Sequence, residues 1–133
     1  MVVGSAAVDI TAQVQTGVDN ALLMHSTAPG NVSMSLGGVA RNVAEAAHRV
    51  INSNEPELSS LLLAAIGDDY FGRLLTTETN AIGMRVDGLV RSDKRTPVVN
   101  MILDSHGGLV GGVADVKGPA TAALNIDTVG FLI

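Results

Sequence analysis

Hydrophobic and polar positions along this chain predict strands and helices in alternation. The longest uninterrupted apolar run, residues 61–66, is typical of a strand that a parallel sheet buries on both faces. Residues 32–36 alternate apolar with polar side chains, as in a half-exposed strand. The pattern predicts strands at 1–5, 32–36, 61–66 and 86–90, and a hairpin of 97–103 with 109–113 around the turn 104–108. This order of elements indicates the α/β class.

A first amphipathic helix is predicted to begin at Val39. Its apolar positions recur at helical spacing, which predicts an inward face of Val39, Val43, Ala46, Ala47 and Val50. Asn42 falls on that inward face, where an amide needs a definite partner. The polar face is predicted to hold Arg41, Glu45, His48 and Arg49.

A second helix is predicted to begin after Gly67-Asp68-Asp69 and to end at Gly83. Aspartate at a helix start commonly accepts hydrogen bonds from the free N–H groups there, so we expect a structural role for Asp68 and Asp69. Residues 11–31 are polar and turn-rich, which places Asp9 at the end of the first strand. A further helix is predicted to start within 120–124.

Composition limits the architecture. The 133 residues suffice for one domain, and because 47% are hydrophobic but only 2% aromatic, the core must be built from Val, Leu, Ala and Ile. The mean hydropathy of +0.36 is high for a soluble domain. It predicts apolar surface that the rest of a larger fold or a partner subunit would cover.

Charge and cysteine content exclude several classes of function. The net charge is −5 and no basic stripe follows any predicted face, so we expect no nucleic-acid partner. The longest apolar run is far too short to cross a bilayer, so we expect no membrane partner. Without cysteine the chain has no disulfide, no thiol nucleophile and no Cys-ligated zinc, which fits the cytoplasm. His25, His48 and His106 lack metal-ligand spacing, so we expect no metal site.

The segment Gly37-Gly38-Val39-Ala40-Arg41-Asn42-Val43-Ala44 is the strongest candidate for chemistry. The two glycines let a ligand approach the backbone at a helix N-terminus, and the amide of Asn42 both donates and accepts, as a sugar hydroxyl requires. A purely structural turn with a buried, satisfied Asn42 is the alternative, and the residues alone leave both open. The chain has no P-loop, no Rossmann glycine pattern between strand and helix, and no nucleophile elbow.

Several motifs occur in one order along the chain: Gly4-Ser5-Ala6-Ala7-Val8-Asp9, Pro29-Gly30, Gly37-Gly38-x-x-x-Asn42, Gly67-Asp68-Asp69-x-x-Gly72 and Thr96-Pro97. In this order and spacing they resemble the amino-terminal half of the PfkB (ribokinase-like) carbohydrate and nucleoside kinases. The Arg41-Asn42 pair, and Thr79-Asn80 before Gly83, are most similar to the pseudouridine kinase branch. The resemblance covers nearly all of the chain.

The resemblance implies a ribokinase-like, doubly wound α/β sheet with a small β lid, of which residues 1–133 form a single partial kinase domain. Residues 10–36 and 97–113 would supply the lid strands. By the same resemblance, Asp9 would accept hydrogen bonds from sugar hydroxyls, and Gly37, Gly38 and Asn42 would form the floor of the sugar pocket. Asp115 would be a further acidic group near the substrate. Ala7 stands where many relatives carry Asn, which leaves the identity of the acceptor open.

The activity that the resemblance implies is transfer of phosphate from ATP, with Mg²⁺, to the 5′-hydroxyl of a nucleoside such as pseudouridine. In this family the catalytic Asp belongs to the motif Asp-Thr-x-Gly-Ala-Gly-Asp, which this sequence lacks. Asp127-Thr128-Val129-Gly130 is similar to its opening, but Phe131 follows, and we interpret the match as coincidence. We therefore expect no catalytic residue and no ATP-binding half in this chain, and no activity of the chain alone.

The first hypothesis is therefore a kinase that binds a small sugar or nucleoside and dimerises through its lid sheet. Two other functions stay open. One is a non-catalytic module that keeps only the sugar pocket or the dimer contact. The other is an unrelated α/β nucleotide-binding domain that shares the glycine turn by chance.

Overall fold

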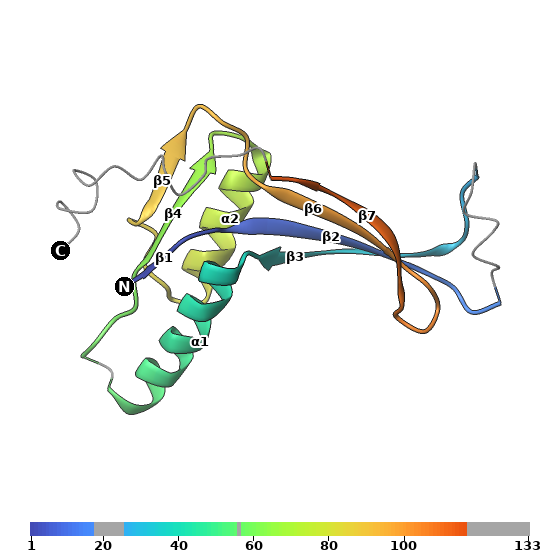
Figure 1. The fold of residues 1–133 in the computed structure, drawn as a ribbon. Coiled ribbons are helices and arrows are strands. Elements are labelled where there is room, and N and C mark those ends of the chain that lie inside the picture. Colours follow the sequence, from blue (N-terminus) through green and yellow to red (C-terminus); the bar gives the residue numbers. More distant parts are fainter. Residues whose placement is uncertain (18–25, 56, 117–133) are drawn as a thin grey trace.

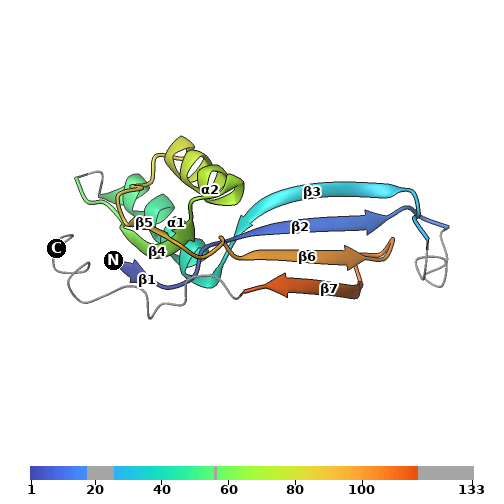
Figure 2. The same ribbon diagram turned by 90° about the horizontal axis from the view of Figure 1, so that it is seen from above.

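In the computed structural model, residues 1–17, 26–55 and 57–116 are described. They form two sheets set end to end and two helices (Figures 1 and 2). The core sheet is all parallel, with the strand order β1 (Val2–Val3), β4 (Leu62–Gly67), β5 (Leu89–Ser92). The second sheet, called here the distal sheet, has the order β3 (Gly30–Gly37), β2 (Ala7–Val14), β6 (Val98–Leu103), β7 (Leu109–Asp115). The helices are α1 (Val39–Asn54) and α2 (Tyr70–Ala81).

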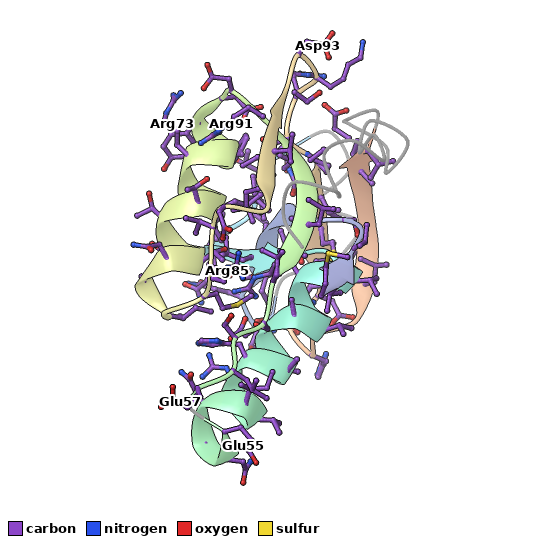
Figure 3. The ribbon with its side chains drawn as sticks, turned by 90° about the vertical axis from the view of Figure 1, so that its left-hand side faces the viewer. Glu55, Glu57, Arg73, Arg85, Arg91 and Asp93 are labelled. Carbon is purple, nitrogen blue, oxygen red and sulfur yellow. The ribbon has the colours of Figure 1, made fainter. Side chains whose placement is uncertain are left out.

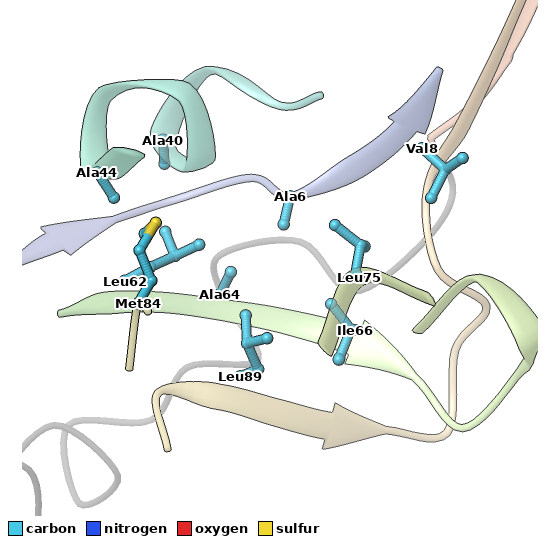
Figure 4. Close-up of a cluster of buried hydrophobic side chains, with 10 residues drawn as sticks. All are labelled: Ala6, Val8, Ala40, Ala44, Leu62, Ala64, Ile66, Leu75, Met84 and Leu89. Carbon is cyan, nitrogen blue, oxygen red and sulfur yellow. The ribbon is translucent and has the colours of Figure 1, made fainter. Parts of the chain in front are cut away.

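β4 is the centre of the core, as its uninterrupted apolar run predicts. All six of its residues are buried, and parallel strands flank it on both sides. Its even-numbered side chains join a cluster with Ala44 of α1 and Leu75 of α2 (Figure 4). Both helices therefore cover the same face of the core sheet, as Figure 2 also shows. Figure 4 draws the whole cluster: Ala6, Val8, Ala40, Ala44, Leu62, Ala64, Ile66, Leu75, Met84 and Leu89.

The predicted inward face of α1 is wrong. Val39, Val43 and Val50 are 77%, 50% and 63% exposed, and Asn42 and Ala46 are exposed too. The buried face of α1 consists of Ala40, Arg41, Ala44 and His48.

The physical reason is that small side chains, rather than valines, allow the close approach of α1 to the sheet. Ala40 and Ala44 join the core cluster, and the polar residues beside them are buried because they have partners. The Arg41 guanidinium pairs with Glu45 at 2.5 Å, and Nε2 of His48 lies 3.0 Å from the carbonyl oxygen of Ile82. Hydrophobic periodicity therefore identified the helix and misplaced its inner face.

The position of Asp9 also differs from the prediction. The first strand is only Val2–Val3, and the chain turns at Gly4 into a second strand, β2, which spans Ala7–Val14. Asp9 is thus the third residue of a long distal strand, which pairs with β3 on one side and β6 on the other. The alternating pattern of residues 7–14 was the signal for this strand.

Most other predicted elements are confirmed. The hairpin forms from β6 and β7, which pair antiparallel, and α2 begins after Asp69 as predicted. The predicted strand at 86–90 is found at Leu89–Ser92, because residues 86–88 belong to the turn that precedes it. The helix predicted within 120–124 and the segment Asp127–Gly130 lie outside the described residues.

Apolar surface remains exposed on this structure, as the high hydropathy predicts. Val39, Val43 and Val50 on α1 and Val3 on β1 lie near one edge of the core sheet. Along the described chain, no helix has the length and apolar content that crossing a membrane requires.

Candidate functional site

Two connections between the sheets cross each other at Gly38, and this crossing builds the site. Gly38 has a φ of 95°, and a Cβ there would lie 2.5 Å from the carbonyl oxygen of Ser5 and 2.7 Å from Cα of Ala6. The amide of Arg41 donates to the same Ser5 carbonyl at 3.2 Å. Only glycine fits a position that combines a left-handed conformation with such close backbone contact. The crossing places the start of α1 beside the start of β2.

Gly37 provides space for the carboxylate of Asp9. The two residues lie on the same face of the distal sheet, since Ala7 is paired with Gly37 and Asp9 with Ser35. A Cβ at Gly37 would overlap both carboxylate oxygens of Asp9 and lie 2.6 Å from its Cγ. No residue in the described ranges donates a hydrogen bond to this carboxylate, so both of its oxygens are available to a ligand.

A cavity of about 370 Å³ lies where these elements meet. Its polar side chains include Asp9 from β2 and Asn42 from the first turn of α1. The opposite wall is apolar and comes from the start of β6, with Pro97 and Val99. No Lys or Arg is among its lining residues, which also include Gly4, Ser5, Ala7, Gly38 and Ala65.

Arg41 fixes the amide of Asn42. Nη1 of Arg41 donates to Oδ1 of Asn42 at 3.4 Å and pairs with Glu45 at 2.5 Å. This contact leaves both N–H groups of Nδ2 free to donate to a ligand in the cavity. Glu45 in turn accepts from Nε of Arg49 at 2.9 Å. The hydrogen bond from Arg49 lowers the pKa of Glu45 most, desolvation opposes it, and the charge of Arg41 lowers it further, so Glu45 stays ionised beside Arg41.

The structure brings Asp9, Gly37, Gly38 and Asn42 together but not Asp115. Asp115 pairs with Val98, which is level with Val8, so its side chain lies on the face of the distal sheet opposite to Asp9. There it makes an ion pair with Arg95 at 2.6 Å and lines a separate hollow of about 420 Å³. That hollow is the larger of the two, but its charged groups already have partners: Arg95 pairs with Asp115, and Asp69 accepts hydrogen bonds from Gly72 and Thr96.

Three parts of the site were not identified from the sequence. Arg41 was assigned to the solvent face, although its position directly before Asn42 indicated that it could contact that amide. The apolar wall of Pro97 and Val99 was assigned to the lid without a contact to the ligand. Thr96, which precedes Pro97, was noted only as part of a motif.

Thr96 and Asp69 form a polar cluster behind this wall. Oδ1 of Asp69 accepts from the amide of Gly72 at 2.8 Å and from the hydroxyl of Thr96 at 2.7 Å, and Oδ2 accepts from the amide of Thr96 at 2.8 Å. Burial raises the pKa of Asp69, but the hydrogen bonds from Thr96 and Gly72 outweigh it, and the pKa is lowered overall. The predicted capping role of Asp69 is therefore confirmed, with an additional partner.

The cavity suits a neutral ligand that carries hydroxyl groups. A hydroxyl can donate to Asp9 and accept from Nδ2 of Asn42, while Pro97 and Val99 pack against carbon atoms. Within residues 1–17, 26–55 and 57–116, no three His, Cys, Asp or Glu side chains converge as a metal ion would require.

Comparison with known proteins gives consistent results. The model of the pfkB family carbohydrate kinases matches residues 1–110. A pseudouridine kinase from Escherichia coli (strain K12) is 28% identical over 118 residues, which are 88% of this chain and 34% of that protein. The chain thus spans about a third of the length of that relative.

Solved structures share the fold. The structure of a protein described as a sugar kinase, from Clostridium perfringens, is similar with a TM-score of 0.73 at 27% identity, over 98% of this chain and 38% of that one. A sugar kinase from Pyrococcus horikoshii in complex with ATP is similar with a TM-score of 0.66 at 22% identity, over 96% of this chain and 38% of that one. At that identity the second likeness shows the fold alone.

The lowered pKa of Asp69 predicts a pH-dependent contribution to stability. The contribution is complete above the unfolded-state pKa, near 3.8, and is lost as the pH falls through the lower folded-state value. Asp69→Asn should therefore reduce the free energy of unfolding by about 2 kcal/mol at pH 7, and the difference from wild type should shrink below about pH 4. Urea unfolding between pH 7 and pH 2.5 measures this.

Asp68→Asn is the matched control, because the Asp68 side chain is 82% exposed and has only a 3.9 Å ion pair with Arg73. It should leave the profile nearly unchanged. A difference between wild type and Asp69→Asn that stayed constant down to pH 2.5 would contradict the assignment.

Proposed function

Because the chain belongs to the pfkB family of carbohydrate kinases, we propose that it forms the sugar-binding part of a kinase that phosphorylates the 5′-hydroxyl of a nucleoside, with pseudouridine as the acceptor. The observation that carries this proposal is the cavity in which a free carboxylate, Asp9, faces the amide of Asn42. The distal sheet is then the lid over the sugar.

The chemistry of the cavity supports a ribose ligand. Vicinal hydroxyl groups donate to carboxylate oxygens, and the unused lone pairs accept from an amide N–H. Asp9 and Asn42 offer these two functions from different elements, held by the crossing at Gly38. The cavity volume of about 370 Å³ lies in the range of small-molecule sites.

The specific acceptor rests on the relatives. The Escherichia coli protein similar to this chain is a pseudouridine kinase. Arg41, whose place before Asn42 resembles the pseudouridine kinase branch, would have a physical role here, since its hydrogen bond would orient the amide that meets the ligand. We also propose a cytoplasmic location, with which the cysteine-free sequence is compatible.

ATP would supply the phosphoryl group, but this cavity does not fit its triphosphate. No cationic side chain lines the cavity, and the carboxylate of Asp9 would repel phosphate oxygens. The Pyrococcus horikoshii relative holds ATP. We therefore place the groups that hold ATP and Mg²⁺ outside this cavity, and we assign no phosphoryl-transfer step to the described residues.

A second candidate function is a non-catalytic module that binds a sugar or assembles through the distal sheet. The face of this sheet opposite to Asp9 carries Val32, Met34 and Val113, which are 72%, 53% and 74% exposed. An exposed apolar sheet face favours contact with a second copy of the chain. The two functions differ in what the loss of Asn42 should do.

Asn42→Ala should weaken pseudouridine binding by about 10- to 100-fold, because the ligand hydroxyl loses its amide partner. Stability should change little, since Asn42 is exposed. Isothermal titration calorimetry measures the affinity. Asn54→Ala, an exposed amide at the far end of the same helix, is the matched control and should bind as wild type. An unchanged affinity with an unchanged oligomeric state would favour the assembly module.

Gly37→Ala should also weaken pseudouridine binding, by about tenfold or more, because its methyl group displaces the Asp9 carboxylate. Gly111→Ala in β7 is the control, since a Cβ there meets nothing within 4 Å. Calorimetry compares the two variants, and a crystal structure of Gly37→Ala should show the carboxylate moved. Equal affinity of both variants would refute the role given to Gly37.

The chain by itself should show no ATP-dependent phosphorylation of pseudouridine, because it contains no Gly-Ala-Gly-Asp motif to supply the catalytic base. Incubation of the pure chain with ATP, Mg²⁺ and pseudouridine, followed by chromatography of the nucleotide product, tests this. Product formation above that of an Asn42→Ala control would overturn the prediction.

A further inference from the structure

The motif Gly67-Asp68-Asp69-x-x-Gly72 has no part in the cavity, and its packing indicates what it does. The connection from β5 to β6, residues 93–97, leads from the core sheet into the distal sheet and lies against the start of α2 (Figures 1 and 2). It is one of three described connections between the sheets, and the other two cross at Gly38. The distal sheet is therefore held at a second point, where this connection meets α2.

Hydrogen bonds at that point are concentrated on Thr96, which is 2% exposed. Its amide and hydroxyl both donate to Asp69, at 2.8 Å and 2.7 Å. Its hydroxyl oxygen also accepts from the amide of Gly67 at 2.9 Å. One side chain thus joins the end of β4, the start of α2 and the start of β6.

The two glycines of the motif allow this approach. A Cβ at Gly67 would lie 2.6 Å from the carbonyl oxygen of Lys94 and 2.7 Å from the amide of Thr96. A Cβ at Gly72 would lie 2.8 Å from Nη1 of Arg91 and would overlap the carbonyl oxygen of Gly67. Arg91 reaches from β5 toward α2 (Figure 3) and donates to that carbonyl at 2.7 Å, which closes the cluster.

The next residue, Pro97, is part of the cavity wall. Its carbonyl oxygen accepts from the amide of Val8 at 3.0 Å, beside Asp9, and the strand then continues to Val99 on the same wall. A shift of Thr96 would therefore move the apolar wall relative to Asp9 and Asn42. A helix cap alone would need only the bond from Gly72 to Asp69.

We propose that Asp69 and Thr96 form a latch that sets the orientation of the distal sheet and holds the Pro97–Val99 wall against Asp9 and Asn42. They are positioning residues, with no contact to the ligand themselves. The effect of the latch on ligand affinity rests on the proposed function, whereas its effect on the orientation of the sheet does not.

Distance measurement between two spin labels tests the latch without any ligand. The chain has no cysteine, so His106→Cys at the tip of the β6–β7 turn and Ser53→Cys at the end of α1 give a specifically labelled pair on exposed residues. Pulsed electron–electron double resonance should give one narrow distribution of distances between the two labels in this background. Adding Thr96→Val or Asp69→Ala should shift or clearly broaden it. Adding Thr96→Ser, which keeps the hydroxyl, or Asp68→Asn should leave it unchanged.

Pseudouridine affinity, measured by calorimetry, gives the second readout. Thr96→Val and Asp69→Ala should each weaken pseudouridine binding by about tenfold, whereas Thr96→Ser should bind as wild type does. Thermal melting by circular dichroism establishes that each variant is folded at the temperature of measurement. If Thr96→Val does not fold, Asp69→Asn, which keeps the size of the side chain and one acceptor oxygen, takes its place.

The outcomes separate the two proposals. A lowered melting temperature with an unchanged distance distribution would overturn the latch and leave Asp69 a simple cap. A changed distribution in a protein that binds no pseudouridine in any form would support the latch and refute the proposed function. A changed distribution with unchanged affinity would overturn the positioning role.

Discussion

The crossing of two chain connections at Gly38 is the constraint on which the rest of the site depends. Backbone meets backbone there, at distances that leave no room for a Cβ, so the start of α1 and the start of β2 have one relative position. Asp9 and Asn42, which are 33 residues apart in sequence, face one cavity for this reason. Glycine at this position loses more conformational entropy on folding than another residue would. In return, the site gains a fixed geometry rather than packing energy.

The polar groups around the crossing are divided between satisfied and free ones. Nη1 of Arg41 and Nε2 of His48 have partners, although Nε of Arg41 is buried without one in the described part of the chain, and Asp69 accepts three hydrogen bonds. In contrast, the carboxylate of Asp9 and Nδ2 of Asn42 have no partner among the described residues, and both line the cavity. Because these two unpaired groups come from different elements and line one cavity, their convergence supports a ligand there more strongly than the cavity volume does.

The sequence predicted the fold better than the orientation of its parts. The apolar run of β4, the β6–β7 hairpin and the cap at Asp69 follow from local rules, and they are confirmed. The inner face of α1 was wrong, because the close packing of Ala40 and Ala44 against the sheet outweighed the apolar character of Val39, Val43 and Val50. Asp115 was grouped with Asp9, although the alternation of side chains along β6 and β7 separates them. Both errors concern partners that are distant in sequence, which periodicity does not encode.

The same argument explains why the motif at residues 67–72 resembled an ordinary helix start. Its capping bond from Gly72 to Asp69 is local and could be predicted, but its contact with Thr96 joins residues 27 apart. Neither glycine of the motif has a φ in the left-handed region, so both are needed for close approach rather than for a turn. Gly67 and Gly72 are therefore informative without a left-handed conformation, because each marks a place where another segment comes close enough to exclude a side chain, whereas Gly111 marks none.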